Sequence, residues 1–336
     1  MRKNKLSVLP ALLLAAGALL AGCGNKPAAG GAGAVDADTL SATAVRFDAD
    51  SALAFVKRQC DFGPRVPDSE AHRLCGDYIA AKFRSYGLVV TEQNTTVTGW
   101  DGKRLGCRNI IAAYRPELAD RVIVCAHWDS RPWADADPDS ANHRTPVMAA
   151  NDGASGVAVM LELARLMREL KPAVGVDFIC FDMEDYGAPY WAEQTDEGND
   201  WCLGSQYWSA HPHKEGYKAR FGILLDMVGG AGARFCYEGF SLQYARDVVG
   251  KIWAAAATAG KSEFFPSEDG TYAQDDHKPM NEVAGIPTVD IIPFHGYGER
   301  SFGPTWHTVS DTPENISTAT LEAVGQTVLQ VLSEEK

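Results

Sequence analysis

Helix-like and strand-like hydrophobic patterns alternate along the chain from about Val45 onward. Apolar positions spaced three or four residues apart predict amphipathic helices, over residues 51–59, 69–86, 153–168 and 317–332. Alternating or continuous apolar runs predict strands, over residues 88–97, 108–114, 121–126, 174–181, 222–226 and 286–292. This order predicts an α/β fold, a three-layer α/β/α sandwich. Its central sheet is mixed and mainly parallel, with antiparallel strands from the early section.

The first 22 residues follow a different pattern. A short cationic start precedes an apolar run over residues 6–21, which is short for a membrane span and typical of a secretory signal. Leu20-Ala21-Gly22-Cys23 resembles the bacterial lipobox, which implies a signal peptide over residues 1–22 and a lipidated Cys23. The alternative is a plain signal peptide that ends by coincidence at a cysteine.

Residues 23–43 are rich in Ala and Gly and predict a flexible tether, followed by one catalytic domain over residues 44–336. Multiple acyl chains on Cys23 would anchor the chain stably to a membrane. We therefore expect a protein of the bacterial cell envelope. Because Gly24 rather than Asp follows the cysteine, the outer membrane, facing the periplasm, is the expected site.

The composition favours some classes of protein and argues against others. A hydrophobic content of 46% and a charged content of 22% describe a globular protein with a sizeable core. The net charge of −13, without clustered Lys and Arg, argues against nucleic acid as a partner. Cys125 and Cys180 lie in apolar runs and are expected in the core, whereas Cys60 and Cys75 are a candidate disulfide. No Cys-x-x-Cys occurs, so a thiolate zinc site is not expected.

Polar residues gather where the buried strands end. His127 follows one strand, Glu184 and Asp185 a second, and Asp226 a third. The carboxyl ends of parallel strands line the ligand crevice of an α/β sheet, so these side chains are expected to converge. Oxygen and nitrogen ligands without sulfur fit a catalytic zinc, and one of two adjacent carboxylates can then carry protons.

Each residue also has an ordinary structural explanation. Asp152 could be only a helix cap, and Glu184-Asp185 only a solvated turn. The acidic stretch Asp135, Asp137 and Asp139 imitates a calcium loop but lacks the required Gly and Glu, so we expect a solvated loop. Serine-nucleophile elbows, His-Glu-x-x-His and phosphate-loop motifs are absent from the sequence.

Taken together, the motifs resemble the M28-type zinc aminopeptidase superfamily, and within it the glutaminyl-peptide cyclotransferases, especially their bacterial envelope members. The resemblance covers about residues 55–332. The segments that carry it are His127–Ser130, Ala150–Gly156, Phe181–Asp185, Leu225–Gly229, Asp275–His277 and Trp306–Thr308.

This resemblance implies an enzyme that acts on peptide and protein N-termini and cyclises N-terminal glutamine to pyroglutamate, releasing ammonia. It implies a zinc-aminopeptidase-like fold with one zinc ion and the following roles. Asp152, Asp185 and His307 would hold the zinc, Glu184 would be the general acid/base, Asp226 and Asp275 would form an acidic network beside it, and Trp191 and Trp306 would line the pocket.

Two positions depart from the animal cyclotransferases, in which Asp185 is Glu and Asp290 is His. The main alternative is a two-zinc aminopeptidase on the same fold, in which His127 and Asp226 would hold a second ion and Asp152 would bridge the two. A peptide-binding lipoprotein without catalysis is a third possibility, against which the intact Glu184 argues.

Overall fold

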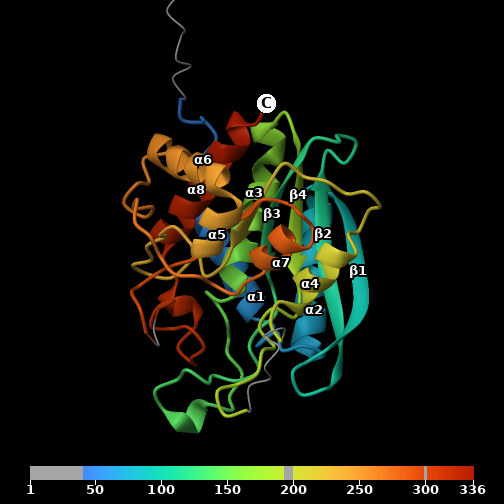
Figure 1. Ribbon diagram of the computed structural model, residues 1–336, viewed down its shortest axis with the longest axis vertical. Coiled ribbons are helices and arrows are strands. Elements are labelled where there is room, and N and C mark those ends of the chain that lie inside the picture. Colours follow the sequence, from blue (N-terminus) through green and yellow to red (C-terminus); the bar gives the residue numbers. More distant parts are fainter. Residues whose placement is uncertain (1–40, 193–199, 299–300) are drawn as a thin grey trace, which may run out of the picture. The chain divides into compact units, whose positions relative to one another are not determined.

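Four neighbouring strands are parallel in one six-stranded sheet, in a computed structural model that describes residues 41–192, 200–298 and 301–336. All of them belong to the compact unit Leu40–Lys336. The strand order is β1-β2-β4-β3-β5-β6, and β1 and β2 are antiparallel. Figure 1 shows this antiparallel pair at the right-hand edge. The strands are β1 (Val89–Thr98), β2 (Arg104–Tyr114), β3 (Arg121–His127), β4 (Gly175–Phe181), β5 (Gly222–Leu225) and β6 (Thr288–Ile291).

Alternation along the buried strands supplies two apolar faces. Val124 of β3 and Phe178 of β4 pack into the larger core, whereas Cys125 and Ile179 pack into a smaller one on the opposite face. Because successive side chains point to opposite sides of a sheet, fully apolar strands require cover on both faces. The predicted three-layer sandwich with a mainly parallel sheet is confirmed.

Helices cover both faces of the sheet. The larger core is closed by α1 (Ala49–Cys60), α2 (Glu70–Ser85), α3 (Ala154–Leu170), α6 (Arg246–Thr258) and α8 (Thr318–Glu334). On the smaller core lie α4 (Leu203–Ala210) and α7 (His277–Glu282), and α5 (Gly239–Tyr244) packs beside β6. Short 3₁₀ turns occupy Ser140–Asn142 and Pro313–Asn315. The sequence did not predict α4 to α7.

Helix starts follow the expected capping chemistry. Ser69 accepts a hydrogen bond from the backbone N–H of His72 at 3.1 Å, and Ser317 accepts one from Thr320 at 3.3 Å. Helix α3 has no side-chain cap, and Gly153 precedes it with φ of +102°. A Cβ atom on Gly153 would lie 2.8 Å from the carbonyl oxygen of Asp129, so this position requires glycine.

The predicted disulfide is wrong. Cys60 and Cys75 are both free, buried thiols that pack into different apolar clusters. Both thiols fill core space, and burial raises the pKa of Cys60 to about 11 and that of Cys75 to about 12. Cys125 and Cys180 are buried in the core, as expected.

The predicted signal segment and Cys23 lie outside the described residues. The last residues assigned to the tether are held by the domain, since Gln330 on α8 accepts a hydrogen bond from the backbone N–H of Thr43 at 2.7 Å. Within residues 41–192, 200–298 and 301–336, no helix is both long and apolar enough to cross a membrane.

Candidate metal centre and active site

Three side chains from separate parts of the chain meet at the carboxyl edge of the sheet. Asp152 precedes α3, Asp185 follows β4, and His307 comes from the loop before α8. One donor atom from each lies within 4.8 Å of the other two. The Nε2 atom of His307 is 3.2 Å from Asp185 Oδ1 and 3.6 Å from Asp152 Oδ2. The structure therefore brings the three predicted ligands to one point.

Unsatisfied polar atoms show that this cluster fits a cation. Asp152 Oδ2, Asp185 Oδ2 and His307 Nδ1 are buried without a hydrogen-bond partner, whereas buried polar groups are nearly always paired. Burial and the nearby Arg131 lower the pKa of His307 to about 3, so its imidazole is neutral, the form that binds metals. Burial and the Asp152 carboxylate raise the pKa of Asp185, a repulsion that a divalent cation would relieve. Two carboxylates and one imidazole suit a catalytic zinc.

The backbone is held in an uncommon conformation at the same place. His307 has φ of +52°, Met183 +57° and Met227 +50°, all in the left-handed region that non-glycine residues rarely occupy. Met183 precedes Glu184, and Met227 follows Asp226. Strain of this kind clusters at functional sites because the surrounding fold holds it there.

Asp129 orients both sides of the site, although the sequence did not single it out as a site residue. Its carboxylate accepts hydrogen bonds from the backbone N–H groups of Glu184 at 3.2 Å and Asp185 at 3.1 Å. It also lies 3.4 Å from His127 Nδ1. In the sequence, the position of Asp129 two residues after His127 could have indicated this role. Asp311 acts similarly on the opposite side, accepting from the N–H of Asp152 at 3.0 Å.

The solvated loop predicted over Asp135, Asp137 and Asp139 is wrong for Asp135 and Asp137, which are buried, whereas Asp139 is exposed as predicted. Arg131 Nη2 and Nε donate to Asp135 at 2.6 and 2.7 Å. Arg131 Nη1 also lies 3.4 Å from Asp185 Oδ1, and Asp135 Oδ1 lies 3.6 Å from His307 Nδ1. Asp135 thus supports the metal site, because the buried Arg131 that it pairs with also contacts Asp185.

Glu184 lies beside this cluster and belongs to a different group, with Cys202 and Asp275. The Cys202 thiol donates to Glu184 Oε1 at 3.3 Å, and His127 Nδ1 is 4.0 Å from Glu184 Oε2. Burial, followed by repulsion from Asp185 and Asp275, raises the pKa of Glu184 well above its usual value despite the opposing effect of His127. A carboxyl with a raised pKa suits proton transfer near neutral pH.

His127 links Asp152 to a second carboxylate. Its Nε2 atom is 3.0 Å from Asp152 Oδ1 and 3.2 Å from Asp226 Oδ1. Burial lowers the pKa of His127, but hydrogen bonds with Asp129, Asp152 and Asp226 outweigh it and raise the pKa well above the usual value. Burial and Asp275 raise the pKa of Asp226 to about 8. These three groups are also the ones that a second metal ion would use.

The predicted acidic network extends behind Asp226. Asp275 lies close to His277 and to Asp290, whose side chain is fully buried. His277 Nε2 is 3.0 Å from Glu238, a residue that the sequence did not indicate. The position that is His in animal cyclotransferases therefore carries a buried acid here, and His277 lies beside it.

A cavity of about 440 Å³ opens onto these groups. Its polar side chains include Asp152, Glu184, Asp226 and Asp275, and its walls include Met227, Ile292, Phe302 and two tryptophans. Trp306 stacks on the His307 ring at 3.9 Å, and Trp201 lies parallel to that ring at 5.9 Å. An apolar pocket with a few converging polar groups is the usual form of a small-ligand site.

Trp191 lies elsewhere, which corrects one predicted pocket residue. Its ring is 41% exposed, stacks on His143 at 6.4 Å and contacts the Arg144 guanidinium at 4.8 Å. Among the described residues that line the cavity, Trp201 takes the place expected for Trp191. The sequence carries both tryptophans ten residues apart, so only the fold could choose between them.

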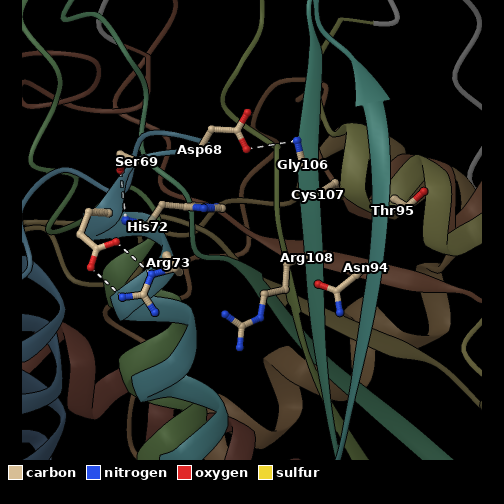
Figure 2. A pocket seen from close by; sticks show the side chains of 10 residues that line it. Asp68, Ser69, His72, Arg73, Asn94, Thr95, Gly106, Cys107 and Arg108 are labelled. Atoms are coloured by element: carbon tan, nitrogen blue, oxygen red, sulfur yellow. Dashed lines mark hydrogen bonds and ion pairs between the residues drawn. The ribbon is translucent and has the colours of Figure 1, made fainter.

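A second cavity of about 320 Å³, called here the α2 cavity, lies between the start of α2 and strands β1 and β2. Figure 2 shows its lining, with hydrogen bonds joining Asp68 to Gly106 and Ser69 to His72. Its cations are paired with carboxylates. Arg73 contacts Glu70 and Asp77, Arg108 contacts Asp77 and Glu92, and His72 contacts Asp182 at 2.8 Å.

Comparison with known families agrees with this geometry. The model of peptidase family M28 matches residues 109–332, more than half of the chain. The chain belongs to peptidase family M28. The match contains the three converging residues Asp152, Asp185 and His307, together with Glu184.

Similar M28 proteins carry two kinds of name. A glutaminyl cyclase from Bacteroides thetaiotaomicron, solved with N-acetylhistamine, is 51% identical to this chain. The match covers 87% of this chain and 99% of the cyclase chain, with a TM-score of 0.85. A leucine aminopeptidase precursor from Bacteroides thetaiotaomicron VPI-5482 is 50% identical to this chain. The match covers 88% of this chain and 100% of the precursor chain, with the same TM-score of 0.85.

Aminopeptidase YwaD from Bacillus subtilis is 29% identical over 238 residues, which are 68% of this chain and 44% of that protein. This chain therefore spans less than half the length of that curated relative. The family and its glutaminyl cyclase neighbours imply zinc as the metal of this site.

Proposed function

We propose that this chain is a zinc-dependent glutaminyl-peptide cyclotransferase that converts the N-terminal glutamine of peptides and proteins into pyroglutamate and releases ammonia. The observation that carries the proposal is the place of Glu184. It is a buried carboxyl with a raised pKa, beside a three-ligand metal cluster and at the wall of a small cavity. The 51% identity with a bacterial glutaminyl cyclase over 87% of the chain supports the same function.

Asp152, Asp185 and His307 would hold the zinc ion. When bound, zinc supplies a Lewis acid that can polarise the side-chain amide oxygen of the substrate. The orphaned oxygens of Asp152 and Asp185 and the neutral imidazole of His307 provide the donors. Asp129 and Asp311 hold the backbone on either side of these ligands.

Glu184 would transfer the protons in this reaction. Its carboxylate takes a proton from the substrate's α-amine as the amine nitrogen bonds to the side-chain carbonyl carbon. It then returns that proton to the departing ammonia as the original C–N bond breaks. Closing a five-membered ring needs little beyond orientation, which the walls formed by Trp201 and Trp306 can impose. Asp275 lies beside Glu184 and, with Asp185, raises its pKa, and Asp226 lines the same cavity.

One zinc ion is proposed because His127 bridges Asp152 and Asp226 at hydrogen-bonding distances. A protonated His127 would supply between these carboxylates the positive charge that a second metal supplies in a two-zinc aminopeptidase. The ligands for a second ion are nevertheless present, and YwaD and the leucine aminopeptidase precursor resemble this chain. Metal content per chain tests this point, since two zinc ions would favour hydrolysis.

The decisive assay offers peptides with N-terminal glutamine and measures ammonia and free amino acids in the same reaction. Cyclisation predicts ammonia release without a freed amino acid, whereas an aminopeptidase would liberate glutamine. Glu184→Gln is expected to lower the rate by about 10²–10⁴-fold, and the exposed Glu169→Gln serves as control. Turnover that survives Glu184→Gln would remove this residue from the mechanism.

We also propose that the chain is a lipoprotein of the bacterial envelope, anchored through Cys23. The lipobox-like Leu20-Ala21-Gly22-Cys23 supports this, and Gly24 after the cysteine favours the outer membrane. Labelling of cells with a clickable fatty acid should mark the wild-type protein and leave Cys23→Ala unlabelled. Label that persists in Cys23→Ala would contradict the anchor.

A further inference from the structure

Cys202 is held tightly against Glu184, and the proposed reaction does not use its thiol. Its backbone N–H donates to the carbonyl oxygen of Glu184 at 2.9 Å, and its Sγ lies 3.3 Å from Glu184 Oε1. The residue is fully buried and has φ of +58°. The turn before α4 thus places a sulfur atom beside the general acid/base in a backbone conformation that non-glycine residues rarely adopt.

Asp275 supplies a third donor at the same point. One atom each from Glu184, Cys202 and Asp275 lies within 4.8 Å of the other two. Asp275 Oδ1 accepts the N–H of Asp276, whereas no amide, hydroxyl or basic group donates to its Oδ2, although the residue is only 3% exposed. The neighbouring side chain is another acid, Asp290. A buried carboxylate oxygen without a donor is costly, and a cation is one way to satisfy it.

The spacing suits a small tetrahedral cation. Zn–S bonds of about 2.3 Å and Zn–O bonds of about 2.0–2.2 Å place neighbouring ligands about 3.5 Å apart. The 3.3 Å between Cys202 Sγ and Glu184 Oε1 is close to that separation. Glu184 and Asp275 both line the cavity, which gives an ion a route to the site.

We propose that Glu184, Cys202 and Asp275 form a separate binding site for a thiophilic divalent cation, such as excess Zn²⁺ or Cd²⁺, and that a cation bound there inhibits the enzyme. Binding transfers the thiol proton to solvent and leaves a thiolate, the soft ligand that such ions prefer. The cation occupies the carboxylate of Glu184, which then cannot take a proton from the substrate. The inhibition rests on the proposed function, whereas the binding does not.

This site differs in chemistry from the group formed by His127, Asp152 and Asp226. That group offers nitrogen and oxygen donors alone. The proposed site contains sulfur, so cadmium bound there produces thiolate-to-metal charge-transfer absorption in the near ultraviolet. A cation bound at His127 does not produce this band.

The binding test titrates zinc-loaded enzyme, freed of excess metal, with Cd²⁺ alone. We expect the charge-transfer band to rise to one equivalent in the wild type and to be absent from Cys202→Ser and Cys202→Ala. The serine variant keeps a hydroxyl donor for Glu184. The matched control is Cys125→Ala, which removes a fully buried thiol whose hydrogen-bond contacts are Ile223 O and Met280 Sδ, and it should keep the band.

Asp275→Asn provides a second test that leaves the thiol in place. Because it alters a direct ligand, it is expected to weaken cadmium binding by more than about 100-fold, above the effect of losing an outer-shell partner. The site is disproved if the wild type shows no band, if Cys202→Ser keeps it, or if Asp275→Asn binds cadmium as the wild type does.

Inhibition is then measured as ammonia release at increasing Cd²⁺, with each variant normalised to its own rate without cadmium. The half-inhibitory concentration should rise by more than about 100-fold in Cys202→Ser, which loses a direct ligand, and remain unchanged in Cys125→Ala. A wild-type enzyme that shows the band but keeps its rate would overturn the inhibition and also the role proposed for Glu184. The metal site would still stand, so the two failures can be told apart.

Discussion

The active-site cavity and the α2 cavity are both lined by acidic groups and a histidine, yet their charges are arranged in opposite ways. In the α2 cavity, Arg73 and Arg108 are each paired with two carboxylates. In the active site, carboxylates crowd together and several of their buried oxygens have no donor. Paired charges are typical of structural networks, whereas unpaired buried carboxylates mark a place prepared for a cation or a proton.

Removing a histidine from each cavity should give the largest contrast. Outer-shell partners of metal ligands contribute about 10–100-fold to metal affinity, so loss of a direct ligand should cost more. We therefore expect His307→Ala to lose more than about 100-fold in zinc affinity and nearly all cyclisation. His72→Ala, in the α2 cavity, should bind zinc as the wild type does. Zinc competition with a chromophoric chelator measures both, and equal zinc affinities would remove the distinction between the cavities.

Removing Arg131, beside the metal cluster, and Arg108, in the α2 cavity, tests how burial changes the stability that an ion pair contributes. Arg131 is fully buried and neutralises Asp135 and Asp185, so Arg131→Met should lower the free energy of unfolding by about 3–5 kcal/mol. Arg108 keeps a side chain that is 18% exposed and contacts partly exposed carboxylates, so Arg108→Met should cost about 1 kcal/mol. Urea unfolding of the two variants gives the comparison. A similar loss of unfolding free energy in both variants would mean that burial does not determine how much each arginine contributes to stability.

The His72–Asp182 pair should make stability depend on pH. Burial lowers the pKa of His72, but attraction to Asp182 outweighs it and raises the pKa above 6.5. The stabilisation is therefore fully present below the unfolded-state pKa near 6.5 and is lost as pH rises through the folded-state pKa. Unfolding free energies of the wild type and His72→Gln should converge as pH rises above this range. A gap that widens with pH would contradict this assignment.

The smallest effect is expected at the rim of the α2 cavity. Arg73 is 57% exposed in its side chain and pairs with Glu70 and Asp77 on the same helix. Arg73→Ala should change the free energy of unfolding by about 0.2–1 kcal/mol, since exposed pairs are screened by solvent. Thermal unfolding at low and high salt measures it, and the wild-type advantage should shrink at high salt. A larger loss would show that the α2 cavity is more than a surface network.

Local patterns predicted the sheet and four of the helices that cover it, α1, α2, α3 and α8. Strands β3 and β4 are largely apolar and are buried at every position because both faces are covered, and Ser69 and Ser317 mark helix starts by capping. The region between β5 and β6 gave no such signal. Its helices α5 and α7 have six residues each, too short to show a clear period, and the 13-residue α6 between them was not predicted either.

Residue types at the strand ends predicted a metal site at this edge of the sheet, because the carboxyl ends of parallel strands converge. The resemblance to the M28-type family then implied that Asp152, Asp185 and His307 would hold the ion. The tertiary structure alone decided which groups surround them. Asp135 is buried and paired with Arg131 instead of lying in a solvated loop. Cys60 and Cys75 form no disulfide, and Trp201 rather than Trp191 lines the pocket. Strand alternation is encoded by neighbours in the chain, whereas burial and charge pairing depend on residues that are distant in the sequence and meet only after folding.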